Sequence, residues 1–355
     1  MVSSGCRMRV ALRALGLPVL ATAGLGLVGC EAELRLEGVD TTLSQPVRRT
    51  DQFLSIERAG DGSLVAFADH GVLIEAASGA DPIAWTRVEL PEPAPNFISS
   101  ATCPDGAVYG LSFENELWSR TAGAWNSAPV SSQEQLQALT CNEAGDLWVS
   151  GAFGTLVRSS DGGASWDDFS LYEDFTLTGI TFADDQTGYA VGEFGTLVKT
   201  SDGGESWEMM DPITDDFYPL SVHFNGQDEG WVSGVLGLIL YTNDGGMSWE
   251  TQDTATQASI YGFVTAEANT YAFGDLGALL RYDAESAAWV DQPSPDIPVH
   301  YASAAALDGR LLLVGGWGVV MEVAVTASTA SAANDVVAHV DAGMETHEES
   351  AEEAL

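Results

Sequence analysis

The most constraining feature of this chain is a short box that occurs three times at nearly constant spacing. The box reads S/T-x-D-G-G-x-S-W and occupies residues 159–166, 200–207 and 242–249. Its aspartates, Asp161, Asp202 and Asp244, lie 41 and 42 residues apart. A period near 40 residues indicates that the chain repeats one supersecondary unit.

The residue types of the box favour a turn. An aspartate side chain accepts hydrogen bonds from the backbone N–H groups that follow it, and glycines tolerate a positive φ. The second glycines of the three boxes are Gly163, Gly204 and Gly246. Each box ends in a tryptophan that can pack against a neighbouring unit, namely Trp166, Trp207 and Trp249. We therefore expect the boxes to be structural turns.

The tryptophans and glycines give the number of units. Six tryptophans stand 40, 41, 41, 42 and 40 residues apart, at positions 85, 125, 166, 207, 249 and 289. Repeat glycines follow a similar spacing at positions 154, 195, 237, 277 and 318. The last glycine opens a unit without a closing tryptophan, so we count six complete units and one truncated unit.

Each unit contains short runs rich in β-branched and aromatic residues, separated by Gly, Asp and Asn. Four such runs in about 40 residues predict a β-propeller blade. First strands are expected to begin near residues 53, 97, 136, 177, 220, 260 and 301. The predicted fold is all-β, a seven-bladed β-propeller of four-stranded antiparallel blades over residues 51–326. A strand from residues 30–50 is expected to close the ring, and the acidic stretch 327–355 is expected to be disordered.

The N-terminal segment predicts that the protein is exported from the cytoplasm. Three arginines precede an apolar run that ends in Leu27-Val28-Gly29-Cys30. The run is too short and too rich in glycine for a membrane span but suits a secretory signal over residues 1–29. The ending resembles the signal box of bacterial lipoproteins, which implies lipidation of Cys30 and a lipid-anchored position in the cell envelope, with the outer membrane preferred. An ordinary cleaved signal is the alternative.

The charge of the chain restricts its partners. Thirteen basic residues against 52 acidic ones give a formal net charge of −39. Such a surface repels phosphate backbones, so we expect no nucleic-acid partner. We expect a monomer.

Two cysteines, Cys103 and Cys141, end the predicted first strands of adjacent blades. An extracytoplasmic compartment permits disulfides. The pair is therefore a possible disulfide.

The stretch Gly188-Tyr-Ala-Val-Gly-Glu-Phe-Gly-Thr-Leu-Val-Lys-Thr-Ser-Asp-Gly-Gly-Glu-Ser-Trp207 resembles the photosystem II stability/assembly factor family. The three boxes match the Asp-box, or BNR repeat, of sialidases and related propellers. The resemblance extends over roughly residues 50–325 and is strongest in the central blades. It implies a seven-bladed propeller that binds a membrane protein or a membrane protein complex. A fold carries unrelated functions, so function has to come from the site.

The sequence contains no strong signature of a catalytic site. The mature arginines are few and scattered, and no Ser-His-Asp order, metal spacing or phosphate-binding loop stands out. We expect no enzyme activity, no cofactor and no metal. The alternative is a glycan-directed Asp-box hydrolase of sialidase type, or a lectin, with its site in the channel mouth.

The turns between second and third strands carry the candidate partner-binding face. Five of them read Gly-x-Φ-Gly, with Phe153, Phe194, Leu236, Leu276 and Trp317 at the apolar position. The loops that lead into the first strands share that face and add Tyr218, Tyr261 and Tyr301. A ring of apolar side chains around a channel mouth is typical of a protein-docking surface. The alternative is that each side chain packs on the next blade.

Three cations share one repeat position, namely Arg158, Lys199 and Arg281. They are possible contacts to an anionic partner. The alternative is that they pair with neighbouring acids.

Overall fold

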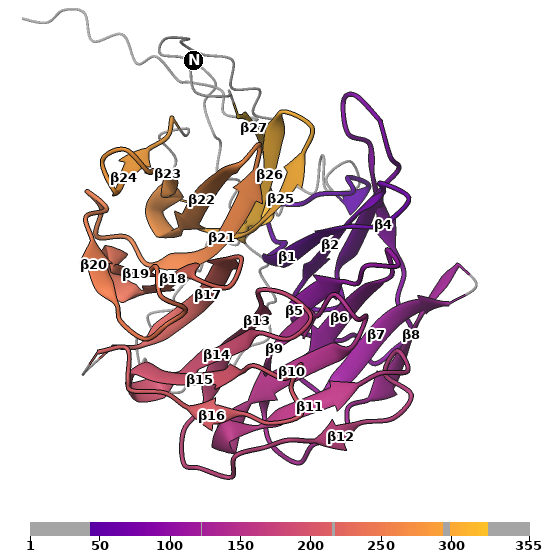
Figure 1. Ribbon diagram of the computed structural model, residues 1–355. Coiled ribbons are helices and arrows are strands. Elements are labelled where there is room, and N and C mark those ends of the chain that lie inside the picture. The colour runs from indigo at the N-terminus through magenta and orange to yellow at the C-terminus, as the bar shows by residue number, and fades with distance from the viewer. Residues whose placement is uncertain (1–42, 122, 215–216, 294–298, 326–355) are drawn as a thin grey trace, which may run out of the picture.

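The computed structural model describes residues 43–121, 123–214, 217–293 and 299–325. Seven antiparallel sheets follow one another along the chain and lie around a common centre (Figure 1). Six sheets have four strands, and the last has three among the described residues. The predicted seven-bladed β-propeller is confirmed.

The first three blades are built from twelve strands. Blade 1 contains β1 (Phe53–Arg58), β2 (Leu64–Ala68), β3 (Leu73–Ala76) and β4 (Trp85–Val88). Blade 2 contains β5 (Phe97–Thr102), β6 (Val108–Ser112), β7 (Glu116–Thr121) and β8 (Ala124–Pro129). Blade 3 contains β9 (Leu136–Cys141), β10 (Leu147–Gly151), β11 (Leu156–Ser159) and β12 (Asp167–Asp168).

Four further blades complete the ring. Blade 4 contains β13 (Leu177–Phe182), β14 (Gly188–Gly192), β15 (Thr196–Thr200) and β16 (Glu208–Met209). Blade 5 contains β17 (Pro219–Asn225), β18 (Glu229–Gly234), β19 (Ile239–Thr242) and β20 (Glu250–Gln252). Blade 6 contains β21 (Ile260–Ala266), β22 (Asn269–Gly274), β23 (Leu279–Asp283) and β24 (Ala288–Asp291). Blade 7 contains β25 (Tyr301–Leu307), β26 (Arg310–Gly315) and β27 (Val319–Ala324).

The core of the propeller lies between neighbouring blades. Second strands such as β10 and β14 are buried along their whole length, because other strands flank them and other blades cover both faces. This burial explains their unbroken apolar and glycine-rich sequences, since a strand with one exposed face would alternate with polar residues.

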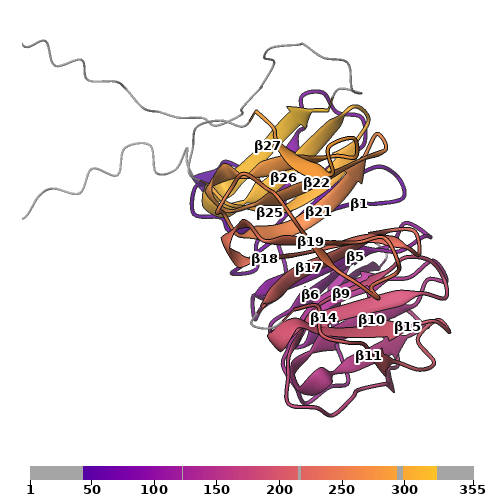
Figure 2. The same ribbon diagram turned by 60° about the vertical axis from the view of Figure 1, so that its left-hand side comes forward.

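Blades 7 and 1 lie side by side, so the ring is closed among the described residues (Figures 1 and 2). Phe53 and Ile56 of β1 share one buried cluster with Leu312 and Val314 of β26. The backbone N–H of Gly318 also donates to the carbonyl of Asp51, at 2.7 Å.

The expected closing strand does not occur among the described residues. Residues 43–50 form turns and no strand. The rest of that segment, the signal 1–29 with the following Cys30, and the tail 327–355 lie outside the described residues. No helix among the residues that the structure describes is long and apolar enough to cross a membrane.

The Asp-boxes form the turns between third and fourth strands. In the first box, Asp161 accepts hydrogen bonds from the N–H and the hydroxyl of Ser165, at 2.8 and 2.6 Å. The hydroxyl of Ser159 donates to the same carboxylate and accepts from Gly163 N–H. Asp202 and Asp244 repeat these contacts with the equivalent residues of their boxes.

Each box also packs on the preceding blade. A Cβ atom at Gly204 would lie 2.1 Å from the indole of Trp148 in blade 3, so only glycine fits there. Trp207 packs edge-on against Trp148, with ring centroids 5.5 Å apart. Trp249 packs on the cluster between blades 4 and 5 and contacts Phe224 of its own blade. Trp166 packs on the cluster between blades 2 and 3. These boxes are structural clamps between blades.

We expect the clamps to weaken in acid. Hydrogen bonds from Ser165 and Ser206 lower the pKa of Asp161 and of Asp202 to about 2, from 3.8. Because the folded-state pKa is depressed, the stabilisation is complete above pH 3.8 and is lost as the pH falls towards 2. Thermal unfolding of the wild type and of a variant with Asp161→Asn and Asp202→Asn, followed from about pH 5 to pH 2, checks this. The variant should be less stable at the upper end of that range, and the difference should shrink with falling pH. A difference that stays constant contradicts it.

Candidate functional site

The loop face of the propeller consists of the turns between second and third strands together with the loops that lead into the first strands. Five of the turns are single 3-10 turns, η1 (Ala152–Gly154), η2 (Glu193–Gly195), η3 (Val235–Gly237), η4 (Asp275–Gly277) and η5 (Gly316–Gly318).

The backbone of these turns is held between two loops. In η1, Ala152 N–H donates to Gln135 in the loop before its own blade, and Gly154 N–H donates to Phe175 in the loop before the next blade. The turns η2, η4 and η5 repeat both bonds. Each of these turns therefore links two successive blades through backbone hydrogen bonds. The side chain of its central residue takes no part in these bonds.

The central residues of the five turns, which we call the tips, have a left-handed backbone. Their φ angles lie between 54° and 62°. For a residue other than glycine or asparagine this conformation costs about 1 kcal/mol or more. The tips are nevertheless large and apolar, and they are exposed at 52% for Phe153, 73% for Phe194, 75% for Leu236, 67% for Leu276 and 58% for Trp317. Exposure at this level leaves no room for the alternative in which each tip is buried on the next blade.

The loops into the first strands contribute unequally. Tyr218 and Tyr261 are exposed at 43% and 37%. Tyr301 is fully buried, so its assignment to the partner-binding face is wrong. Tyr301 is the first residue of β25, the first strand of blade 7, which lies nearest the centre of the ring and is called an inner strand here. The first residues of other inner strands, such as Phe53 and Phe97, are also buried and point between blades. Because side chains alternate along a strand, only the next residue or the loop before it can reach the face.

Two exposed aromatic residues of this face were not predicted from the sequence. Phe113, in the turn between β6 and β7, is 56% exposed, although blade 2 lacks the Gly-x-Φ-Gly pattern. Tyr172, in the loop after β12, is 76% exposed and has a φ of 58°. No repeated motif marks either residue, so the periodicity of the sequence could not find them.

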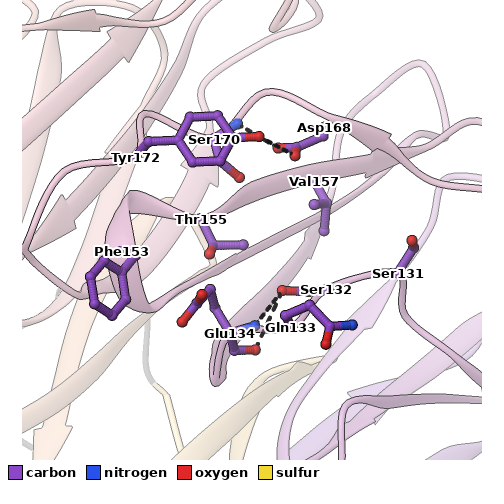
Figure 3. Close-up of a pocket in the computed structure, with 10 residues that line it drawn as sticks. All are labelled: Ser131, Ser132, Gln133, Glu134, Phe153, Thr155, Val157, Asp168, Ser170 and Tyr172. Atoms are coloured by element: carbon purple, nitrogen blue, oxygen red, sulfur yellow. Dashed lines mark hydrogen bonds between the residues drawn. The ribbon is translucent and has the colours of Figure 1, made fainter.

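A pocket of about 470 Å³ opens on this face at blade 3 (Figure 3). Phe153 and Glu134 lie on one side of it, and Tyr172 and Asp168 lie on the other. Thr155 and Val157 of blade 3 lie between them.

The three cations that share one repeat position form contacts within the propeller. Arg158 pairs with Glu205 of the next blade at 2.7 Å and lies over the rings of Phe169 and Trp148. Lys199 donates to the carbonyl of Gly245 at 3.0 Å. Arg281 donates to the backbone of Tyr282. The first two link adjacent blades, so their assignment as partner contacts is replaced by a structural role.

Cys103 and Cys141 form a disulfide, with an S–S distance of 1.96 Å and Cα atoms 5.2 Å apart. The bond joins the ends of β5 and β9, on the face opposite the loop face. No group of three or more His, Cys, Asp or Glu side chains suited to a metal ion occurs among the described residues.

The inner strands touch one another in a closed ring around the centre. On these strands the Asp, Glu, Lys and Arg side chains are Glu57 and Arg58, both in β1. The strand β17 adds His223, and burial lowers the pKa of this imidazole. Burial raises the pKa of Glu57, although its carboxylate accepts hydrogen bonds from Thr102 at 2.6 Å and Ser100 at 2.8 Å. The charged groups of the inner strands therefore come from one blade, whereas apolar side chains ring the loop face.

Known proteins share this architecture. A family model described as Photosynthesis system II assembly factor YCF48 matches residues 164–259. No curated protein sequence matches the chain.

The solved structures with a similar fold include YCF48 proteins and a virginiamycin B lyase. YCF48 bound to D1 peptide has a TM-score of 0.63 and 16% identity, covering 78% of this chain and 93% of that one. YCF48 from Cyanidioschyzon merolae has a TM-score of 0.63 and 14% identity, with coverage of 78% and 95%. A catalytically inactive virginiamycin B lyase from Staphylococcus aureus with quinupristin has a TM-score of 0.66 and 12% identity, with coverage of 77% and 94%. At these identities the structures establish the shared fold alone.

Proposed function

We propose that this chain is a non-catalytic assembly or accessory factor, because it is a seven-bladed propeller and its residues 164–259 match the photosystem II assembly factor family model. In this proposal the loop face binds a segment of a membrane protein or of a membrane protein complex. A peptide-bound structure of a YCF48 protein is one of the structures with the same fold.

The observation that carries the proposal is the ring of exposed apolar tips. Of the fourteen large apolar side chains exposed in the described part of the chain, ten lie on the loop face, namely Phe113, Phe153, Tyr172, Phe194, Tyr218, Val235, Leu236, Tyr261, Leu276 and Trp317. Glycine or asparagine would be more stable at the five left-handed tips. A partner that covers these side chains supplies a reason to keep them, since apolar and aromatic residues dominate the centre of protein interfaces.

The proposed location rests on the N-terminus and the cysteines. We propose an extracytoplasmic, lipid-anchored protein of the cell envelope. The expected signal of residues 1–29, followed by Cys30, supports this location. The disulfide between Cys103 and Cys141 also supports it, because such bonds persist in oxidising compartments.

The proposed lipid anchor can be tested by replacing Cys30. Cys30→Ser should move the protein from the membrane fraction to the soluble fraction of the producing cell, because the acyl chains are the proposed link to the bilayer. Fractionation and metabolic labelling with a fatty acid measure both effects. Cys6→Ser, inside the predicted signal, is the matched control and should leave both unchanged. A Cys30→Ser protein that still carries label and sediments with membranes contradicts the anchor.

The function is tested by affinity capture of the mature protein from solubilised native membranes, with mass spectrometry of what co-purifies. A membrane complex retained through the loop face supports an assembly or accessory role. Binding to a glycan array or turnover of a glycan, without a protein partner, would replace this proposal with the hydrolase or lectin.

A further inference from the structure

The blade 3 pocket combines three parts of the loop face. The loop before β9 contributes Glu134, the turn η1 contributes the tip Phe153, and the loop after β12 contributes Tyr172, with Asp168 at the end of that strand. The volume of about 470 Å³ is sufficient for one long side chain of a bound segment.

The charge of the pocket is negative. None of the ten residues that line it is basic, and two are acidic. Asp168 accepts hydrogen bonds from Ser170 N–H at 2.9 Å and from the Tyr172 hydroxyl at 2.6 Å. Burial raises the pKa of Asp168, but these bonds outweigh it and lower the pKa below the usual value, so the carboxylate is ionised at neutral pH. The carboxylate of Glu134 has no hydrogen bond or ion pair to any part of the chain that the structure describes.

The aromatic rings of the pocket are available to a ligand. Phe153 is 52% exposed and Tyr172 is 76% exposed, and both have a left-handed backbone. The Tyr172 hydroxyl is fixed on Asp168, which holds one ring at the rim opposite Phe153 (Figure 3). An aromatic face attracts a cation, and a guanidinium both stacks on rings and pairs with carboxylates through its planar fork.

We propose that this pocket receives an arginine side chain of the partner segment, an inference that rests on the proposed function of the loop face. The exposed tips of the neighbouring blades contact apolar residues on either side of that arginine. The partner segment is then apolar with a basic residue, which complements a chain of net charge −39.

A second pocket on the loop face lacks this chemistry. It lies at blade 5 beside Leu236 and includes Asp253 and Ala255, but no aromatic side chain lines it. Asp253 is exposed and accepts a hydrogen bond from Ala255 N–H at 3.2 Å. Asp253→Asn therefore removes the same charge from the same face without touching the blade 3 pocket.

The test uses the acetylated and amidated peptide Leu-Arg-Leu-Phe and its citrulline analogue, which is nearly isosteric but neutral. Calorimetric titration of the mature protein should show roughly tenfold tighter binding of the arginine peptide, from one cation–π contact and partly exposed ion pairs. Glu134→Gln and Tyr172→Ala should each reduce this ratio, and Asp253→Asn should leave it unchanged. Added salt should lower the ratio as well.

The outcomes separate this inference from the proposed function. If both peptides bind equally and replacement of the tips abolishes this binding, the arginine pocket is overturned. The proposal that the loop face binds a partner is then still supported. Absence of binding by either peptide also overturns the pocket, while capture from membranes still decides the function. A preference for arginine that survives Glu134→Gln and Tyr172→Ala places the cation elsewhere and overturns the inference.

Discussion

Replacing Phe194 and Trp317 with aspartate should abolish retention of the membrane partner. These tips are 73% and 58% exposed and belong to blades 4 and 7. Aromatic residues at the centre of an interface each contribute about 2 kcal/mol or more, so the double variant should bind roughly a thousandfold more weakly. Affinity capture beside the wild type, followed by titration with the purified partner, measures the effect.

Folding should not be the cause of that loss. Aspartate tolerates a left-handed backbone better than a bulky aromatic residue does, and both side chains are exposed. The thermal unfolding midpoint of the variant should therefore match that of the wild type.

The matched control replaces exposed apolar side chains away from the loop face. Met247 lies in an Asp-box turn and is 72% exposed, and Val290 lies on the outer strand β24 and is 42% exposed. Met247→Asp with Val290→Asp adds the same charge and should retain the partner. Equal loss in both variants would mean that added negative charge, and not the face, decides binding.

Removal of the disulfide should have the largest effect on stability. The bond joins residues 38 positions apart in the sequence, and in the chain-entropy model closure of such a loop contributes about 4 kcal/mol. Cys103→Ser with Cys141→Ser should therefore lower the unfolding midpoint by roughly 10 °C. Thermal or denaturant unfolding measures the difference.

Reduction of the wild type supplies the control for that variant. Added reductant should bring the wild type close to the double variant and should not change the variant itself. A change below about 1 kcal/mol would show that the contacts of β5 with β9 hold these blades without the covalent link.

Much of the fold was predictable because one unit is repeated. The first strands of six blades begin at the predicted residues, and that of blade 5 begins one residue earlier, at Pro219. The Asp-box recurs in blades 3, 4 and 5 because each of these blades has the same turn, held by the aspartate, and the second glycine of the turn packs on the preceding blade. Such local requirements are visible in a sequence.

The candidate site was only partly predictable. Turns with Phe153 and Phe194 were identified, but their exposure was open until the positions of the neighbouring loops were known. Tyr301 is buried because it starts a strand, and Arg158 reaches Glu205 because the next blade folds beside it. No periodic pattern marks Phe113 or Tyr172.

The sequence alone determined the number of blades, the place of the Asp-box turns and the candidate loop face, because these depend on residues within one repeat. The tertiary structure decided which apolar side chains of that face meet solvent, which cations pair internally and where a pocket opens. These features depend on the distances between side chains of different blades, and a one-dimensional pattern does not contain those distances.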